Sequence, residues 1–176
     1  MKKLGIILGL LTLVSTTSAQ SWFGIKAGLN IERYVQTVET HSGLEGDYHA
    51  SVHWDGFHIG IFGKFRQRCG VWGFQPELLY SQSSREHCGI IPLNLLWEPF
   101  GDSPVGIYAL AGPYGQFHKY YSKNLTPLYG RHNDFVWGFG IGGGLRILHL
   151  QIEGKWNWNA ECWQQNQCFL SVAVLF

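Results

Sequence analysis

Serine, histidine and aspartate residues that could form a hydrolytic triad are present, but no nucleophile motif surrounds the serine. Ser81, His118 and Asp134 lie near the ends of segments that we interpret as strands. A nucleophilic serine of this kind sits on a sharp turn with a sequence such as Gly-x-Ser-x-Gly, and the residues around Ser81 do not match it. We therefore assign no catalytic residue and predict that the protein is not an enzyme.

The eight histidines are the most obvious candidates for metal ligands. A zinc site needs three or four ligands that converge, whereas many of these histidines are spread over several predicted loops. Those in or near loops are His41, His49, His53, His87, His118 and His132. The alternating glycines between Trp137 and Leu145 also lack the spacing of a dinucleotide-binding loop. We expect neither a metal nor a cofactor.

The four cysteines could form a disulfide if the chain is exported to an oxidising compartment. Cys162 and Cys168 bracket one predicted hairpin loop and are the preferred pair. A predicted strand separates Cys69 from Cys88, so these two cannot reach bonding distance. Free thiols are an equally open alternative.

The elements that must position these residues are strands, because apolar residues recur with a period of two. We predict eight strands of about ten residues, a length that suits tilted membrane strands. Their predicted ranges are 22–31, 56–66, 71–81, 89–98, 105–118, 134–146, 148–158 and 168–176. The expected fold is an all-β, eight-stranded antiparallel transmembrane β-barrel with up-and-down topology.

The two faces of these strands differ sharply in charge. One face carries no charged residue in any strand, and includes residues such as Ile59 and Leu93. An arginine or lysine at the bilayer midplane costs about 2–4 kcal/mol, so the uncharged face is predicted to contact lipid. The other face should line the lumen. Its charged side chains are expected to form an ion-pair network of Lys26, Lys64, Glu77, Glu153 and Lys155.

Eight strands enclose an interior that side chains can just fill. Gly138, Gly140, Gly142 and Gly144 should point inward and leave space, which Tyr108 and Tyr114 of the neighbouring strand could occupy. We therefore favour a filled lumen, with a narrow polar pore as the alternative.

Three prolines lie inside predicted strands, where proline removes a hydrogen-bond donor from the ladder. They are Pro76, Pro92 and Pro113. A closed barrel has no edge strand to accommodate them, so we predict a β-bulge at each.

The predicted connections alternate between long and short. The longest run from Glu32 to Asp55 and from Lys119 to Asn133, and the short ones all fall at the opposite end. Outer-membrane barrels have longer external loops and short periplasmic turns. The sequence therefore places both termini on the periplasmic side. The final strand ends on Phe176, which resembles the C-terminal aromatic signal of the outer-membrane assembly machinery.

The first 19 residues are predicted to be a cleaved signal peptide. Lys2 and Lys3 precede an apolar run, and small residues precede a cut between Ala19 and Gln20. The alternative, a helical anchor, would need about 20 apolar residues. The predicted domains are thus the signal peptide, 1–19, and one β-barrel domain, 20–176.

The overall charge gives no electrostatic footprint for nucleic acid. The formal net charge is +1, and Lys2 and Lys3 carry two of the positive charges, so the exported chain would carry −1. Charged residues make up only 14% of the chain, well below the usual quarter. We predict no nucleic-acid partner and contact with outer-membrane lipid instead.

Several phrases resemble the PorT-like family of outer-membrane β-barrel proteins. The most specific is Gln-Pro-Glu-Leu-Leu-Tyr-Ser at 75–81, and further matches lie at 23–30, 56–63, 91–95, 111–114 and 137–145. The resemblance implies an outer-membrane barrel of a Gram-negative bacterium, but no single activity.

From these features we expect a non-catalytic protein of the cell outer membrane, with a structural, ligand-contacting or partner-contacting role through its external loops. Two alternatives stay open. One is a small, passive, porin-like channel. The other is a soluble secreted β-barrel that binds a hydrophobic ligand.

Overall fold

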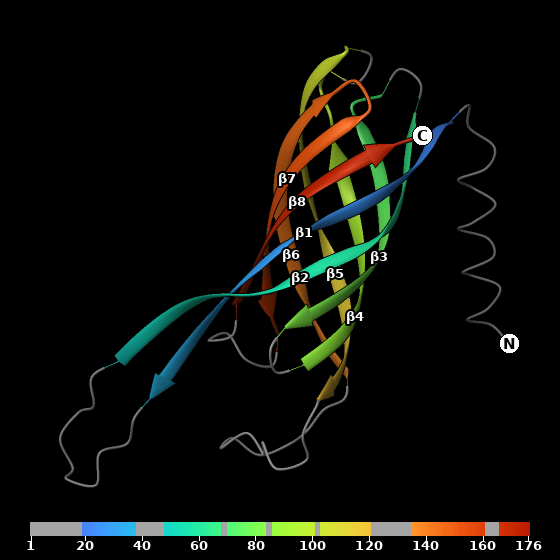
Figure 1. The fold of residues 1–176 in the computed structure, drawn as a ribbon. Coiled ribbons are helices and arrows are strands. Elements are labelled where there is room, and N and C mark those ends of the chain that lie inside the picture. The colour runs from blue at the N-terminus through green and yellow to red at the C-terminus, as the bar shows by residue number, and fades with distance from the viewer. Residues whose placement is uncertain are drawn as a thin grey trace, which may run out of the picture.

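The eight strands close into a single barrel (Figure 1). The computed structural model describes residues 19–37, 48–67, 70–83, 86–100, 103–120, 135–160 and 166–176. Each strand pairs antiparallel with its neighbours in chain order, and the first pairs with the last. The predicted all-β, eight-stranded up-and-down barrel is confirmed. The strands are β1 (Ala19–Thr37), β2 (Tyr48–Gln67), β3 (Trp72–Ser83), β4 (Glu86–Trp97), β5 (Val105–Tyr120), β6 (Phe135–Ile147), β7 (Leu150–Asn159) and β8 (Asn166–Leu175).

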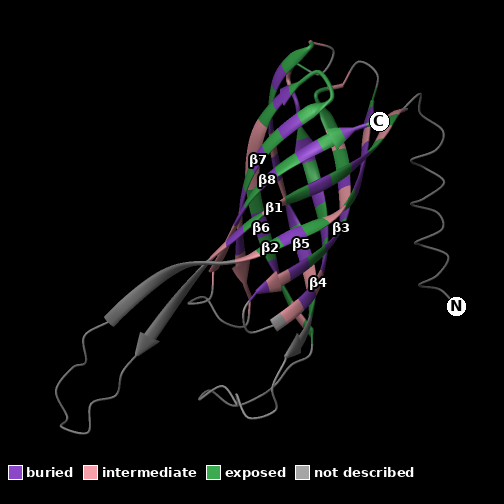
Figure 2. Ribbon diagram, viewed as in Figure 1, coloured by how far each residue is buried: buried purple, intermediate pink, exposed green. Residues whose placement is uncertain are grey.

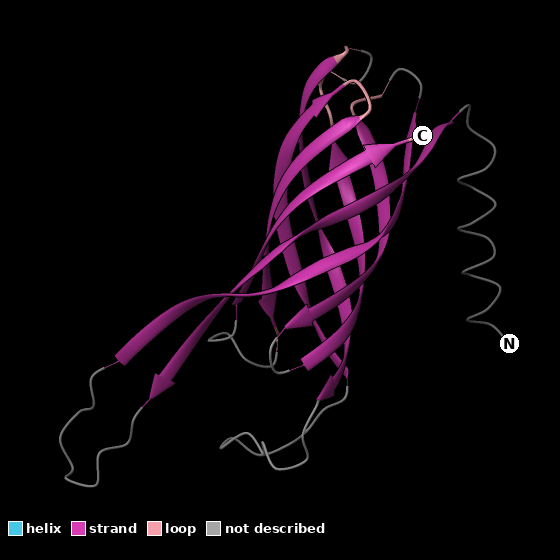
Figure 3. Ribbon diagram, viewed as in Figure 1, coloured by secondary structure: helices cyan, strands magenta, loops and turns pink. Residues whose placement is uncertain are grey.

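Within the described ranges the chain consists of strands and short connections, as Figure 3 shows. None of those residues belongs to a helix that is long and apolar enough to cross a membrane.

The barrel has two different ends. One end, which we call the turn end, holds the start of β1, the end of β8 and the links β2–β3, β4–β5 and β6–β7. The β6–β7 link is only Leu148 and His149, with Leu148 in the left-handed region at a φ of 55°. The other end, the loop end, carries the remaining four links. The termini of the barrel domain thus lie at the same end, as predicted.

Six strands match their predicted ranges to within three residues. The largest difference is in β4, predicted at 89–98 and observed at Glu86–Trp97. The two exceptions are β1 and β2, which are much longer than predicted.

The segment from Glu32 to Asp55, predicted as a loop, is largely a two-stranded extension of the barrel, so that prediction is wrong. β1 and β2 stay paired from Ile31 and Trp54 out to Thr37 and Tyr48. A register shift next to Asn30 leaves Asp55 as an extra residue in β2. We call residues 31–37 and 48–54 the β1–β2 ribbon; it leans away from the barrel in Figure 1. Backbone pairing was missed because a two-stranded ribbon needs no buried face, and hence no strict hydrophobic pattern.

The predicted bulges at Pro76, Pro92 and Pro113 are also wrong. The pairing of β3 with β4 has the same register on both sides of Pro76 and Pro92, and that of β4 with β5 is likewise unchanged around Pro113. The ladders instead lack pairs beside these prolines. A missing donor therefore interrupts hydrogen bonding without inserting a residue.

Where the side chains are described, burial alternates along most of each strand, and Figure 2 shows the alternation as bands around the barrel. The outward side chains are apolar and exposed, whereas the buried positions in the lumen hold most of the charged and amide side chains that the structure describes. Three small apolar clusters also lie in the lumen. The core of this protein is therefore a mixed polar and apolar lumen.

Candidate functional site in the barrel lumen

The orientation of the two strand faces is the one predicted. Lys26 and Glu153 are 1% exposed, whereas Ile59 and Leu93 are 48% and 45% exposed. Charged side chains avoid apolar surroundings unless they are paired. The question for the lumen is therefore how its charges are compensated.

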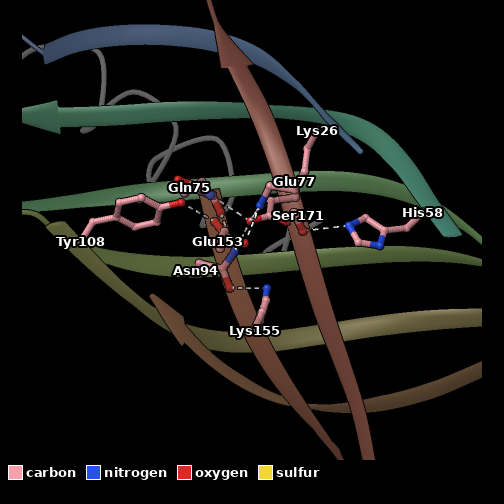
Figure 4. A network of polar contacts seen from close by, with 9 residues as sticks. All are labelled: Lys26, His58, Gln75, Glu77, Asn94, Tyr108, Glu153, Lys155 and Ser171. Atoms are coloured by element: carbon pink, nitrogen blue, oxygen red, sulfur yellow. Dashed lines mark hydrogen bonds and ion pairs between the residues drawn. The ribbon is translucent and has the colours of Figure 1, made fainter. Parts of the chain in front are cut away.

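Lys26 lies at the centre of the lumen between two carboxylates. Its Nζ is 3.0 Å from Oε1 of Glu77 and 2.7 Å from Oε1 of Glu153 (Figure 4). These residues come from β1, β3 and β7, so the ion pairs join strands that are not neighbours in the sheet. Such contacts hold the barrel together across its interior.

The Glu77 carboxylate also accepts hydrogen bonds from amide side chains. Gln75 Nε2 and Asn94 Nδ2 donate to its Oε1 at 2.9 and 2.8 Å. Asn94 in turn accepts a bond from Nζ of Lys155 at 2.9 Å, and Tyr108 donates to Oε2 of Glu153 at 3.1 Å. We call these residues, with Lys26, the central network. Its two lysines and two glutamates balance in charge.

Lys64, which we predicted as part of the same network, belongs to a separate cluster nearer the turn end. Its Nζ is 2.7 Å from Oε2 of Glu98, and Nε of Arg146 is 3.0 Å from the other oxygen of that carboxylate. Arg146 also donates to the Ser103 carbonyl at 2.9 Å. The structure thus brings four of the five predicted lumen residues together. Glu98 and Arg146 lie on the predicted inner face, but their pairing with Lys64 depends on strand register.

A third set of polar side chains was not anticipated. Nδ1 of His58 is 2.6 Å from Oδ1 of Asn30, and its Nε2 is 2.8 Å from the Ser171 hydroxyl. Asn30 also donates to Ser81 Oγ at 2.5 Å. Since Asn30 Oδ1 can only accept, Nδ1 of His58 carries a proton and Nε2 accepts from Ser171 in the neutral ring. The sequence signal was available, because all four residues fall on the predicted inner face.

This serine, histidine and asparagine have the contacts of a nucleophile, a base and an orienting group. However, His58 is 1% and Ser171 is 2% exposed, and the His58 ring packs edge-on against Phe169 at 5.0 Å between centroids. A carbonyl substrate has no access to the hydroxyl. The set therefore connects β1, β2, β3 and β8 within the lumen rather than forming an active site.

The other predicted candidates do not converge. Ser81 lies in the polar set just described, while the His118 side chain and Asp134 fall outside the described residues. In the described part of the chain, no three His, Cys, Asp or Glu side chains gather into a possible metal site. Cys162 is outside the described residues, so its disulfide with Cys168 stays a prediction.

The glycine stripe of β6 receives the two tyrosines of β5, as predicted. A Cβ at Gly138 would lie 2.7 Å from the Tyr114 ring, and one at Gly144 would lie 2.7 Å from the Tyr108 hydroxyl. Both tyrosines are buried. Large side chains thus fill the space that the glycines leave.

Comparisons with known proteins support the fold. The chain is similar to the solved structure of Neisserial surface protein A, with a TM-score of 0.61 and 15% identity over 90% of this chain and 97% of that one. Eight-stranded outer-membrane barrels have this fold. Two further structures also align, OprG from Pseudomonas aeruginosa (TM-score 0.47, 11% identity, 91% and 98% covered) and Ail of Yersinia pestis with sucrose octasulfate (0.47, 13%, 89% and 99%).

At these identities the likeness establishes the fold alone. No protein-family model matches the sequence, and no curated protein matches it either. The resemblance to the PorT-like family therefore stays a hypothesis.

Proposed function

We propose that the protein is an integral β-barrel of the outer membrane, closed to solutes, that acts without catalysis through the surfaces at its loop end. The observation that carries the proposal is the reversed distribution of polarity: an apolar exterior around a lumen that holds paired charges. Monomeric soluble proteins rarely expose large contiguous apolar patches. This observation argues against the soluble secreted alternative.

The exterior has the dimensions of a membrane-embedded surface. On β3 the exposed apolar residues run from Trp72 to Tyr80, which is about 26 Å along the strand and about 20 Å across a barrel of usual tilt. With the length of the terminal side chains, this approaches the apolar band of about 25 Å in outer-membrane barrels. Lipid is therefore the proposed partner of this surface.

Exposed aromatic side chains border the apolar surface at both ends, as interfacial residues do. At the turn end they are Trp72, Trp97 and Phe176, and at the loop end they are Phe57, Tyr80, Phe117, Phe135 and Trp137.

The filled lumen disfavours the passive-channel alternative. Gln75, Asn94 and Leu96 have no exposed surface, and the other side chains of the central network are buried. These side chains fill the middle of the lumen, which leaves no path for a hydrated ion through this cross-section.

The loop end is the proposed contact surface, because function tends to lie on connecting segments held by a rigid scaffold. The β1–β2 ribbon projects from this end, and the link after β5, at residues 121–134, starts there too. We assign the contact of a ligand or partner protein to these segments, on the external side of the membrane.

Two further parts of the proposal concern export. Residues 1–19 would be removed as a signal peptide, and Phe176 would be read by the assembly machinery. Phe176 is highly exposed, and its amide pairs with the Phe23 carbonyl, which extends the closing ladder to the last residue. Membership of the PorT-like family is part of the same proposal.

Subcellular fractionation with a carbonate wash tests the proposal. The protein should stay in the outer-membrane fraction and show heat-modifiable mobility on a gel. Recovery in the periplasmic or secreted fraction would refute it.

A further inference from the structure

Three successive ladders of the barrel are each interrupted once, always beside a proline. β2 and β3 lack the pairs between Phe62–Glu77 and Phe65–Phe74, which flank Pro76. β3 and β4 lack those between Pro76–Leu93 and Leu79–Ile90, which flank Pro92. β4 and β5 lack those between Pro92–Tyr114 and Leu95–Ala111, which flank Pro113.

The remaining ladders are continuous over their described lengths. β5–β6, β6–β7, β7–β8 and β8–β1 pair without a gap, and β1–β2 has only the register shift at Asn30. The interruptions are therefore confined to one part of the barrel wall, from β2 to β5.

The three gaps lie along one diagonal. Pro76 is opposite Leu93, next to Pro92, and Pro92 is opposite Tyr114, next to Pro113. Proline lacks the backbone donor of its pair, and within a bilayer no water replaces that bond. We call this diagonal the proline seam. Among the described strands, it is the region where ladder pairs are missing without a register shift.

The Glu77 carboxylate lies on the lumen side of this seam. Its donors are Lys26 on β1, Gln75 on its own strand and Asn94 on the next strand. Asn94 also donates to the Gln75 carbonyl at 3.2 Å. Side chains thus supply bonds between β3 and β4 beside the gap in their ladder.

We propose that the proline seam is where the barrel wall opens first, between β3 and β4, and that Glu77 holds it closed from the lumen. Glu77 contacts the seam directly, whereas Glu153, which binds the same lysine, lies on β7 between continuous ladders. Removing the Glu77 carboxylate should therefore loosen the proline seam and leave the ladders around β7 unchanged. An opening here would connect the lumen to the membrane sideways.

The test compares Glu77→Gln with Glu153→Gln in the refolded, lipid-embedded protein, by hydrogen–deuterium exchange. With Glu77→Gln, amides of β3 and β4 next to the seam should exchange about tenfold faster or more, while those of β7 and β8 stay protected. With Glu153→Gln, the seam amides should change less. Equal exchange patterns in the two variants, or acceleration spread evenly over the barrel, would overturn the proposal.

A second variant tests the seam without touching the network, and remains informative if Glu77→Gln does not fold. Pro113 is exposed on the outer face, so Pro113→Ala restores a donor towards β4 at little steric cost. Exchange in β4 and β5 should then become several-fold slower. Unchanged or faster exchange would contradict the role of the prolines.

Discussion

Lys26 shows how a charge can be kept inside this barrel. It is fully buried and contacts two carboxylates, so its removal would leave Glu77 and Glu153 close together without that cation. Breaking a buried ion pair from one side costs about 3–5 kcal/mol, because the remaining charge stays desolvated. We therefore expect Lys26→Met to lower the free energy of unfolding by about that amount, measured by urea titration of the refolded barrel in lipid vesicles.

The double variant Lys26→Met with Glu153→Gln is the control for this prediction. It removes one positive and one negative charge, so it should be more stable than Lys26→Met alone, as coupled residues are not additive. If the double variant were less stable than the single one, charge compensation would not be the role of Lys26.

Gly144 is expected to tolerate no side chain. A Cβ there would lie 2.1 Å from the Ile152 carbonyl oxygen and 2.7 Å from the Tyr108 hydroxyl. Gly144→Ala should destabilise the barrel by about 1–3 kcal/mol or more, because overpacking displaces backbone as well as side chains. Gly154 on β7 is a matched control, since nothing lies within 4 Å of a Cβ there. Gly154→Ala should unfold at the wild-type urea concentration, and an equal loss in both variants would refute the steric explanation.

At this scale the sequence was informative about which way a side chain points, but not about its partner. The period of two placed Lys64, Glu98 and Arg146 on the inner face, yet their contacts depend on the stagger between strands. The His58 contacts with Asn30 and Ser171 depend on the same stagger. Register across a closed sheet is a long-range property, which no local pattern contains.

Among the elements, the outer part of the β1–β2 ribbon, residues 34–37 and 48–51, is separable from the barrel. β8 pairs with β1 only up to Arg33, and β3 pairs with β2 only up to Gly56. Replacing residues 34–51 by an Asn-Gly turn between the paired residues Arg33 and Val52 should therefore leave the barrel intact. Heat-modifiable mobility on a gel is the measurement. Its loss would show that the ribbon is needed for folding.

The outward positions of the strands should respond to charge according to depth. Leu93 lies in the middle of β4 and Val105 at the turn end of β5, and both are exposed on the outer face. Leu93→Arg should cost about 2–4 kcal/mol in lipid, and Val105→Arg about 0–1 kcal/mol. Urea titration in vesicles gives both values. Equal, small costs would mean that this surface faces water.

The elements also show where proline rules can mislead. If every main-chain hydrogen bond had to be satisfied, a proline within a strand would indicate a β-bulge. Here the register is unchanged, and side chains in the lumen, such as Asn94 on the Gln75 carbonyl, form bonds beside the gap. The sequence contains both Asn94 and Gln75, but only the fold shows that the Asn94 amide reaches the Gln75 carbonyl.

For the whole molecule, the filled lumen predicts an absence of conductance. The central network and the tyrosines on the β6 glycines occupy the interior. Refolded protein in a planar bilayer should give no stable ion-selective steps. Reproducible steps from the wild-type protein would instead support the channel alternative.

The architecture as a whole was the most predictable level. Strand number, topology and the outward face follow from repeated alternation in eight segments, because each repeat is independent evidence for the same barrel. The ribbon and the division of the lumen into separate networks were not predictable. They depend on pairing beyond the barrel and on register, not on polarity.

The ladder between β1 and β8 joins Gly24 to Leu175, nearly the full length of the chain. A folding chain can therefore form the hairpins between successive strands early. It cannot close into a cylinder until β8 pairs with β1. Until that moment two strands have unsatisfied edges, which favour pairing with other chains. Contacts of such large sequence separation are slow to form, so the joining of the first and last strands is the step that should limit the rate of folding.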